Sequence, residues 1–502
     1  MVHNIVEKFG DYVERFEDVP IYHCIAAIIF ISTFRNILDM FGEGVPFNRD
    51  WLLAHISTGV AVLLILWVIY RLATKEKSEK VMGVLTAFLS VILLGPFVDM
   101  LIYGPREYRH TYMLSGMEGE LVYRFFTFFG PVEDLGPNIG IRVSIFILML
   151  LSFLYFYYKN ENVIRSAFFT FVVYFVMFMG SSTLILMQRS AELLGVDYHP
   201  STLFRVKYFL LWILLLLVIN LYLMRKDYLI GILKEIRPFR LGHYILMIFF
   251  GMGVAHVVNP VEITQYSLTK IVFMLCSFVL AWLFAVFMDK LNSTDKQEPG
   301  IIPLDTCKIM TVSFFFLAII YSYAGGSRVL FFILLFMGGS FFYSAPPFMV
   351  KNIPMISKLP VAVNSLLLLM LGHSLTGELL SIPAAVPIFF FTIFFLAAHF
   401  TDINSFHEDQ EKELKTLPVL LGLKKAKIII GAFFALAVFT SYFVMDAVVS
   451  LGATLSTLLL ALLAAAGVLE FYLIYKDDYK ESSVFLVYLI LAFLLTYILF
   501  IL

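Results

Sequence analysis

The sequence is poor in charge, because Asp, Glu, Lys and Arg make up only 15% of its 502 residues. It has just three cysteines, Cys24, Cys276 and Cys307, whose positions show neither disulfide nor metal-ligand spacing. The formal net charge is −1 and no basic stripe is present, which argues against a nucleic-acid-binding protein. The N-terminus lacks the cleavage pattern of a signal peptide, so we expect the first apolar run to act as its own insertion signal.

Hydrophobic residues, by contrast, make up 61% of the chain and form long runs between bunched charges. About 20 apolar residues cross a bilayer as a helix, and only helices satisfy the backbone groups of such runs in lipid. We therefore predict an all-α polytopic membrane protein with about fifteen transmembrane helices. Six are expected near 20–38, 52–71, 81–103, 141–158, 164–187 and 204–224. Nine more are expected near 241–258, 268–289, 307–324, 328–345, 360–375, 383–401, 427–445, 452–475 and 482–501.

An amphipathic, basic segment at 225–242 separates the two groups of spans. It predicts a six-helix domain at 1–235 and a nine-helix domain at 236–502. The loops on one side of the second group carry seventeen Lys and Arg residues, whereas those on the other side carry only Lys270 and Arg328. By the positive-inside rule the basic side faces the cytoplasm. The N-terminus is then cytoplasmic and the C-terminus outside, in an integral protein of the cell membrane.

One polar stretch interrupts the apolar pattern, HFTDINSFHEDQEKELKTLPVLLG at 399–422. Asp402, Ser405 and Asp409 stand at i, i+3 and i+7, which places them within about 60° on one face of a helix. Carboxylates repeated in this way at a membrane surface favour a Mg²⁺ site that grips phosphate oxygens. The alternative is a solvated loop between two spans.

The same stretch resembles the second aspartate-rich motif of the UbiA family of intramembrane prenyltransferases. Asp402 and Asp409 match the outer aspartates of that motif, the tail KTLPVLLG with Lys415 matches its end, and Ser405 replaces its middle aspartate. The stretch FFYSAPPFMVKNIP (341–354), with Tyr343 and Lys351, closely resembles another motif of the family, Y-S-x-P-P-x-x-x-K. Nine spans in 241–501 equal the family's number, so the resemblance covers about the C-terminal half.

The first aspartate-rich motif of the family departs from its pattern here. In one register Asp289, Asn292 and Lys296 occupy the three positions, and in the other Asp295 is the third carboxylate. Either way, two family carboxylates are missing across the two motifs. Fewer carboxylates predict weaker Mg²⁺ binding.

The resemblance implies an enzyme that uses Mg²⁺ to ionise a polyprenyl diphosphate and moves the prenyl group to a lipid or small aromatic acceptor. It implies metal and diphosphate binding by five side chains, Asp289, Asn292, Asp295, Asp402 and Asp409. Lys351 and Lys415 would neutralise the departing charge. Two other functions remain open: a non-catalytic UbiA-like lipid-handling or transport protein, and a phosphoribosyl- or glycosyl-type transferase acting on polyprenyl phosphate.

Several polar residues near these motifs are candidates for substrate binding, namely Tyr343, Asn364, His373 and His399. An ionisable residue within a span is a functional candidate by default. The alternative for His373 and Asn364 is a hydrogen bond between neighbouring helices.

The first half of the sequence resembles no family that we can name. Its segment 93–142 holds four Gly-Pro pairs, which stiffen turns. Four polar residues there are candidates for a second site that binds a polar head group on the outer face, namely Asp99, Arg106, Arg109 and His110. The alternative is that Asp99 pairs with an arginine and the segment packs as a lid.

Overall fold

The computed structural model describes most of the chain. The described residues are 2–43, 49–104, 121–131, 137–193, 202–258, 268–292, 301–353, 356–375, 381–411, 416–449 and 452–501. They are helical and contain no strand. They form two compact units, Met1–Leu229 and Ile230–Leu502, here the N-terminal and C-terminal units. The division falls six residues before the boundary predicted at 235/236.

Helices occupy all of the predicted spans. Fourteen are long and apolar enough to cross a membrane, and Lys358–Ser374 is a shorter apolar helix of 17 residues. At 1.5 Å per residue, those 17 residues extend about 26 Å, close to the ~30 Å of a hydrocarbon core. The all-α polytopic membrane fold is therefore confirmed.

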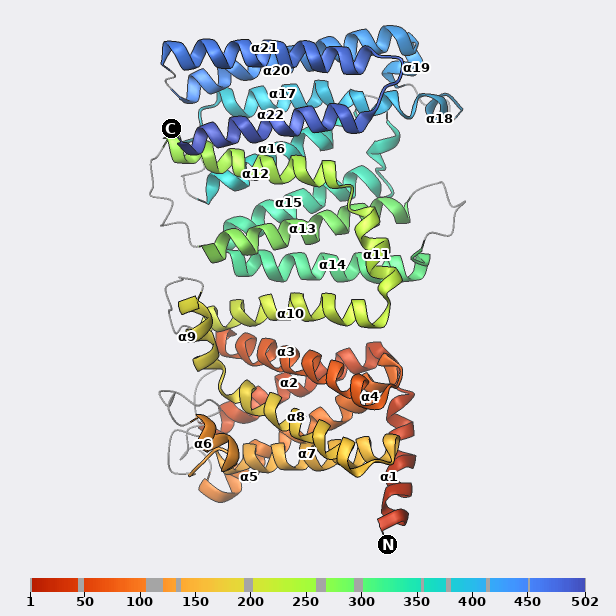
Figure 1. Cartoon of the computed structure of the whole chain (residues 1–502), viewed down its shortest axis with the longest axis vertical. Coiled ribbons are helices and arrows are strands. Elements are labelled where there is room, and N and C mark those ends of the chain that lie inside the picture. Colours follow the sequence, from red (N-terminus) through yellow and green to blue (C-terminus); the bar gives the residue numbers. More distant parts are fainter. Residues whose placement is uncertain are drawn as a thin grey trace. The chain divides into compact units, whose positions relative to one another are not determined.

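The N-terminal unit is a helical bundle (Figure 1). Its helices are α1 (Val2–Glu17), α2 (Ile21–Glu43), α3 (Arg49–Thr74), α4 (Ser78–Leu89), η1 (Ser90–Leu93), α5 (Leu94–Tyr103), α6 (Leu121–Phe126), α7 (Ile139–Asn160), α8 (Val163–Ser181), α9 (Thr183–Leu193) and α10 (Thr202–Met224). The amphipathic α1 is held by Glu17, which is buried and pairs with Lys159 at 2.7 Å and Lys80 at 3.3 Å.

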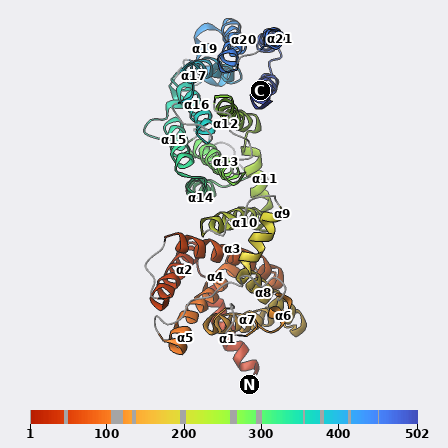
Figure 2. The ribbon, with the colours of Figure 1, turned by 90° about the vertical axis from the view of Figure 1, so that its left-hand side faces the viewer.

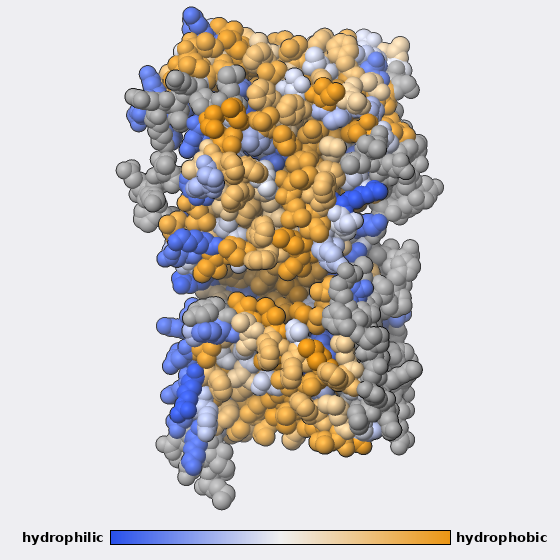
Figure 3. Space-filling model, turned by 180° about the vertical axis from the view of Figure 1, so that it is seen from behind, coloured by the Kyte–Doolittle hydropathy of each residue, from blue (hydrophilic) through white to orange (hydrophobic). Residues whose placement is uncertain are grey.

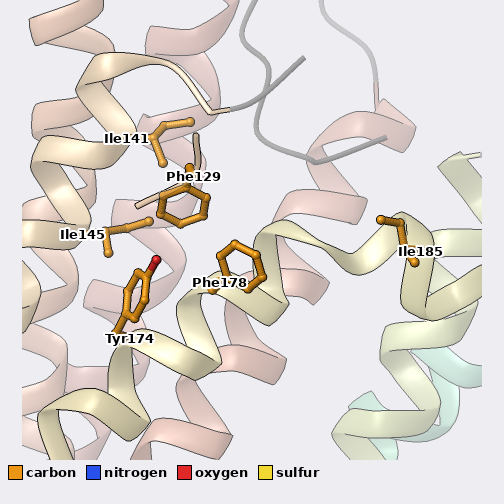
Figure 4. Packing of buried hydrophobic residues seen from close by; sticks show 6 residues of the cluster. All are labelled: Phe129, Ile141, Ile145, Tyr174, Phe178 and Ile185. Atoms are coloured by element: carbon orange, nitrogen blue, oxygen red, sulfur yellow. The ribbon is translucent and has the colours of Figure 1, made fainter. Parts of the chain in front are cut away.

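This unit contains a cluster of buried aromatic and aliphatic side chains (Figure 4). Phe129, Tyr174 and Phe178 pack together with isoleucines of α7 and α9. The Tyr174 hydroxyl donates a 2.6 Å hydrogen bond to the Phe125 carbonyl. The cluster thereby fixes the segment after α6 against α7 and α8.

The C-terminal unit contains the remaining helices, shown along their axes in Figure 2. They are α11 (Lys226–Glu235, which spans the division), α12 (Pro238–Val258), α13 (Leu268–Leu291), α14 (Leu304–Gly325), α15 (Ser327–Ser344), η4 (Val350–Asn352), α16 (Lys358–Ser374), α17 (Ala385–Ala397), η6 (Ala398–Ile403), α18 (Phe406–Glu411), α19 (Leu417–Leu421), α20 (Leu423–Val448), α21 (Ala453–Tyr475) and α22 (Glu481–Ile501). The pairs α12–α16, α13–α14 and α20–α21 pack most extensively.

The outer surface of each unit is largely apolar, as contact with lipid requires. Hydrophobic side chains cover most of the face in Figure 3, and hydrophilic ones gather toward its edges. Large apolar side chains such as Leu458, Ile490 and Phe493 are exposed along the helices. The helices therefore present lipid-facing surfaces while keeping polar groups inside.

Candidate active site

Asp289, near the end of α13, is the centre of a first ion-pair cluster. Its Oδ1 accepts hydrogen bonds from Lys351 Nζ at 2.9 Å and from Ser344 Oγ at 3.2 Å. Its Oδ2 lies 3.5 Å from Arg237 Nη2. The cluster therefore joins α13 to the end of α15, to η4 and to the α11–α12 connection.

The two turns that carry these cations have unusual backbone conformations. Arg237 itself has φ of 53°, and Met349, two residues before Lys351, has φ of 39°. Non-glycine residues in this left-handed region are uncommon and cost on the order of 1–3 kcal/mol. Such strain concentrates at functional sites, so these two turns are candidates for ligand contact.

Asp402, in η6, is the centre of a second cluster that is almost completely buried. Its Oδ1 accepts a short hydrogen bond from Lys358 at the start of α16, and its Oδ2 lies 3.3 Å from His399 Nδ1. Lys358 Nζ also donates to Thr401 Oγ1 at 3.2 Å. With Asp402 and Lys358 only 8% and 9% exposed, each charge depends on the other for compensation.

The single helical face predicted for Asp402, Ser405 and Asp409 is not what the structure shows. Asp402 lies in a 3₁₀ helix, Asn404 and Ser405 form a turn, and a separate short helix, α18, carries Asp409. Ser405 bridges the two pieces, because its hydroxyl lies 3.3 Å from the Asp402 carbonyl and 2.8 Å from Asp409 Oδ2. The predicted single helix is thus divided into two short helices, which Ser405 links.

A network from the α21–α22 connection positions η6. The Tyr479 hydroxyl donates to the Phe400 carbonyl at 2.9 Å. Burial raises the pKa of Tyr479, and the Glu481 carboxylate raises it further, so this phenol stays a neutral donor. Glu481 accepts from Asn404 Nδ2 at 2.8 Å and lies 3.4 Å from Arg240 Nη2.

A cavity brings the two clusters together. Asp289 and Ser344 of the first cluster and Lys358 and Thr401 of the second line its wall, and it holds about 1140 Å³ of empty space counted out to its mouth. Tyr343, also in the wall, lies within electrostatic range of both Asp289 and Asp402. Two acidic helix ends that are far apart in the sequence therefore meet at one cavity.

The wall has a second polar group deeper along α12 and α16. His243 contacts the Tyr488 hydroxyl through Nδ1 at 2.7 Å and the Ser365 hydroxyl through Nε2 at 2.9 Å. Asn364, 5% exposed, donates from Nδ2 to Ser340 Oγ at 3.3 Å, while its Oδ1 has no hydrogen-bond partner among the described residues. A buried, unsatisfied amide oxygen is costly, which marks Asn364 as a candidate for ligand contact.

An apolar cavity of about 690 Å³ adjoins this polar one. Phe394, Ala397, Phe434 and Tyr488 line both. Most of its other lining is Phe, Leu, Ile, Val and Met, from α12, α17, α20 and α22. A cavity with charged side chains in its wall therefore adjoins an apolar cavity.

The other predicted residues of this half either do not line the polar cavity or lie outside the described residues. Asn292 donates Nδ2 to the Met288 carbonyl at 2.9 Å, within its own helix. His373 is fully buried where α12 crosses α16, and the described cavity wall does not include it. Asp295 and Lys415 lie outside the described residues.

The structure gives Asp99, predicted as part of a second site, a local contact. It lies buried in α5, within the third span, and its Oδ1 accepts the Gly140 N–H at 2.7 Å at the start of α7. Nearby, Arg142 donates to loop carbonyls, including that of Gly130 at 2.6 Å. These contacts favour the alternative of a packed segment. Arg106, Arg109 and His110 lie outside the described residues.

Comparison with known proteins agrees with this geometry. A model described as the UbiA prenyltransferase family matches residues 299–497. The matched residues all lie within the C-terminal unit, which resembles the UbiA family over most of its length. No curated protein matches the chain. The N-terminal unit lies outside the residues that the family model matches.

Solved structures of UbiA homologues are similar to part of the chain. One from Archaeoglobus fulgidus, bound to GPP and Mg²⁺, shares 18% identity over 54% of this chain and 98% of its own, with a TM-score of 0.43. Its complex with DMAPP and Mg²⁺ gives the same identity and coverage and a TM-score of 0.42. A homologue from Aeropyrum pernix K1 shares 19% identity over 52% of this chain and 98% of its own, with a TM-score of 0.41.

The donors at the polar cavity suit Mg²⁺ by their chemistry. The described residues contain no cluster of three or more His, Cys, Asp or Glu side chains able to hold a metal ion. Mg²⁺, however, is usually bound through one or two carboxylates, with waters and substrate phosphates as the other ligands. Asp289 lines this cavity, and Asp402 is paired with Lys358, which lines it as well.

Sequence reasoning missed four important cavity residues. Lys358, Arg237 and Arg240 were used only to predict which side of the membrane is cytoplasmic. The sequence around a basic loop residue does not reveal which carboxylate it pairs with. His243 lies inside a span, so the rule that selected His373 would have selected it as well.

Proposed function

We propose that the C-terminal unit is a membrane prenyltransferase that moves a polyprenyl group from a diphosphate donor to a lipid or small aromatic acceptor. The observation that supports it best is a cavity at which two carboxylate–lysine pairs meet, adjoining an apolar cavity, in a unit that resembles the UbiA family. A polyprenyl diphosphate has two matching parts, a charged diphosphate and an apolar prenyl chain. We place the reaction at the polar cavity.

The cations around the cavity suit the diphosphate. Lys358, Arg237 and Arg240 line the wall, and Lys351 is held against Asp289. Charge-assisted hydrogen bonds from such groups stabilise negative charge that develops on a leaving group. Mg²⁺ held by Asp289 and Asp402 would supply Lewis-acid assistance to the same departure. When a diphosphate binds, Lys351 and Lys358 can exchange a carboxylate partner for a phosphate partner, so that each lysine keeps an anionic neighbour.

The neighbouring apolar cavity suits the prenyl chain. Its aromatic wall excludes water, which protects a reactive carbocation from hydrolysis. Asn364 and His243, between the charged end and the apolar cavity, are placed to orient the acceptor. Lipid and small aromatic acceptors both carry a hydroxyl or ring carbon that these polar groups can position.

The test uses the purified full-length protein in lipid, supplied with labelled prenyl diphosphates and candidate acceptors. We expect labelled lipid product and released pyrophosphate, both abolished by a chelator and restored by Mg²⁺. Asp402→Asn should lower the rate by about 10²- to 10³-fold, the scale for loss of one key electrostatic group. Asp305→Asn is the matched control, because Asp305 is exposed and its ion pair among the described residues is with Lys308.

Two results would replace this function with another. Transfer of a phosphoribosyl or sugar group to polyprenyl phosphate, without prenyl transfer, would assign the glycosyl-type reaction. Donor binding without turnover would assign lipid handling. Prenyl transfer that is indifferent to both chelator and Asp402→Asn would reject the assigned site.

A further inference from the structure

The N-terminal unit contains its own cavity, lined by residues of α2, α3, α4, α7 and α8. It holds about 1280 Å³ of empty space counted out to its mouth. Along α3 its wall runs from His55 to Leu66, which at 1.5 Å per residue is about 16 Å, or half of a ~30 Å hydrocarbon core. The cavity therefore lies within the depth of the bilayer.

This cavity is polar at one end and apolar along the rest. The middle turns of α3, α4 and α7 supply leucines and isoleucines, including Leu66, Leu85 and Leu148. The polar end combines residues of α2, α3 and α7, held together by contacts such as Arg35 Nη1 to the Ile92 carbonyl at 2.8 Å. A ligand that matches both parts has a polar head and a hydrocarbon body.

The uncharged groups at the polar end present hydrogen-bond acceptors. The Thr58 hydroxyl donates its proton to the Ala54 carbonyl at 2.7 Å, and the Ser144 hydroxyl donates to the Gly140 carbonyl at 3.0 Å. Asn36, 7% exposed, donates Nδ2 to the Ser32 carbonyl at 2.9 Å. Because the two hydroxyl protons are spent within their own helices, the Thr58 and Ser144 oxygens remain to accept from a ligand, and the Asn36 amide offers its oxygen beside a second N–H. The matching head is a donor.

The charges at this end favour an uncharged head. The Arg35 guanidinium pairs with Asp39 at 3.3 Å. Asp99 also lies within electrostatic range of Arg35 and Asp39. Among the described Asp, Glu, Lys and Arg side chains at this end, the Arg35 guanidinium thus faces two carboxyl groups, so a phosphate or carboxylate head would meet repulsion while a cationic head would meet Arg35.

We infer that this cavity binds a neutral lipid through its hydroxyl group, with the hydrocarbon body along α3, α4 and α7. A long-chain isoprenoid alcohol and a diacylglycerol share this chemistry. The site is independent of the transferase site, because all of its residues belong to the N-terminal unit. It remains whether or not the C-terminal unit transfers prenyl groups.

The test is photolabelling of the purified full-length protein in vesicles. The probes are a diazirine-bearing isoprenoid alcohol, a diazirine-bearing diacylglycerol and the monophosphate of the same alcohol. We expect at least one hydroxyl lipid to label peptides of α3, α4 or α7. The excess unlabelled lipid should compete, and the phosphorylated probe should label the same peptides at least ten-fold less.

Two variants probe the polar and apolar parts separately. Gly59 lies in the wall, and a Cβ built there meets no atom within 4 Å, so Gly59→Leu fills empty space without a clash at its Cβ. We expect at least a ten-fold loss of labelling. Gly338→Leu is the matched control, because Gly338 is also helical with an open Cβ direction but lies in α15.

Thr58→Val removes one acceptor at almost constant volume. We expect about five-fold weaker binding, the scale for one neutral hydrogen bond. Thr170→Val is its control, because Thr170 has the same hydrogen bond to the residue four positions before it but does not line the cavity.

Each outcome decides the proposal. Labelling by the alcohol alone or by the diacylglycerol alone supports it and identifies the lipid. Absence of N-terminal labelling, stronger labelling by the phosphate, or equal labelling of the Gly59→Leu and Thr58→Val variants and of their controls would overturn it. Because Thr58→Val preserves volume, it keeps the test valid if Gly59→Leu fails to fold.

Discussion

The buried pair between Asp402 and Lys358 links stability to chemistry at the scale of single residues. Lys358→Met leaves the Asp402 carboxylate with His399 as its side-chain partner among the described residues, and loss of one partner of a buried pair costs about 3–5 kcal/mol. We expect a clear fall in the unfolding temperature in detergent. Adding Asp402→Asn to Lys358→Met should restore most of that stability but no pyrophosphate release.

The exposed pair of Lys308 and Asp305 provides the control. Its side chains are 63% and 92% exposed, and surface pairs contribute about 0–1 kcal/mol, so Lys308→Met should leave the unfolding temperature nearly unchanged. Two outcomes for the variant with both Lys358→Met and Asp402→Asn would contradict the prediction.

If this double variant unfolds as easily as Lys358→Met alone, the ion pair of Asp402 and Lys358 is not the source of the instability. If the double variant still releases pyrophosphate, that ion pair has only a structural role.

At the scale of helices, the crossing of α12 and α16 sets the shape of the candidate active site. A Cβ on Gly251 would lie 1.9 Å from the Leu369 carbonyl oxygen, and one on Gly372 would lie 1.9 Å from that of Ile248. The two backbones therefore touch, as small residues permit in membrane helices. Arg240 and His243 on α12 and Lys358 and Asn364 on α16 owe their common cavity to this contact.

Gly251→Ala should force these helices apart. We expect a loss of stability of about 1–3 kcal/mol from overpacking, together with weaker donor binding, because both walls of the cavity move. Thermal unfolding and donor affinity measure the two effects. Gly338→Ala, whose Cβ meets nothing within 4 Å, should change neither. Normal affinity in a destabilised Gly251→Ala protein would show that the crossing does not shape the cavity.

At the scale of the whole molecule, the two ends of α21 test the predicted orientation. In a background with Cys24, Cys276 and Cys307 replaced, Asp478→Cys and Gly452→Cys each place one thiol in a connection that flanks α21. The basic loops are predicted to be cytoplasmic. An impermeant maleimide should then label Gly452→Cys in intact cells and Asp478→Cys only after permeabilisation. The reverse pattern would invert the topology and place the candidate active site outside.

Residues of the candidate site that belong to sequence motifs could be predicted, whereas isolated residues could not. Asp289, Asp402 and Lys351 belong to motifs with fixed spacing, and the structure places them at or beside one cavity. His243 stands alone in an apolar helix, and its partners Ser365 and Tyr488 lie 122 and 245 residues away in the sequence. The single helix predicted to carry Asp402 and Asp409 is interrupted by a turn at Asn404 and Ser405, which the spacing of the two aspartates does not reveal.

The sequence alone determined that this is an all-α membrane protein, where its spans lie, and which family its second half resembles. Those conclusions rest on length, hydropathy and motif spacing, which are properties read along the chain. Only the tertiary structure decided that Lys358 pairs with Asp402, that charged and apolar cavities adjoin, and that the N-terminal unit holds a cavity of its own. Ion pairs and cavities arise where separate helices meet, and the angle and depth of those meetings come from side-chain packing across the bundle.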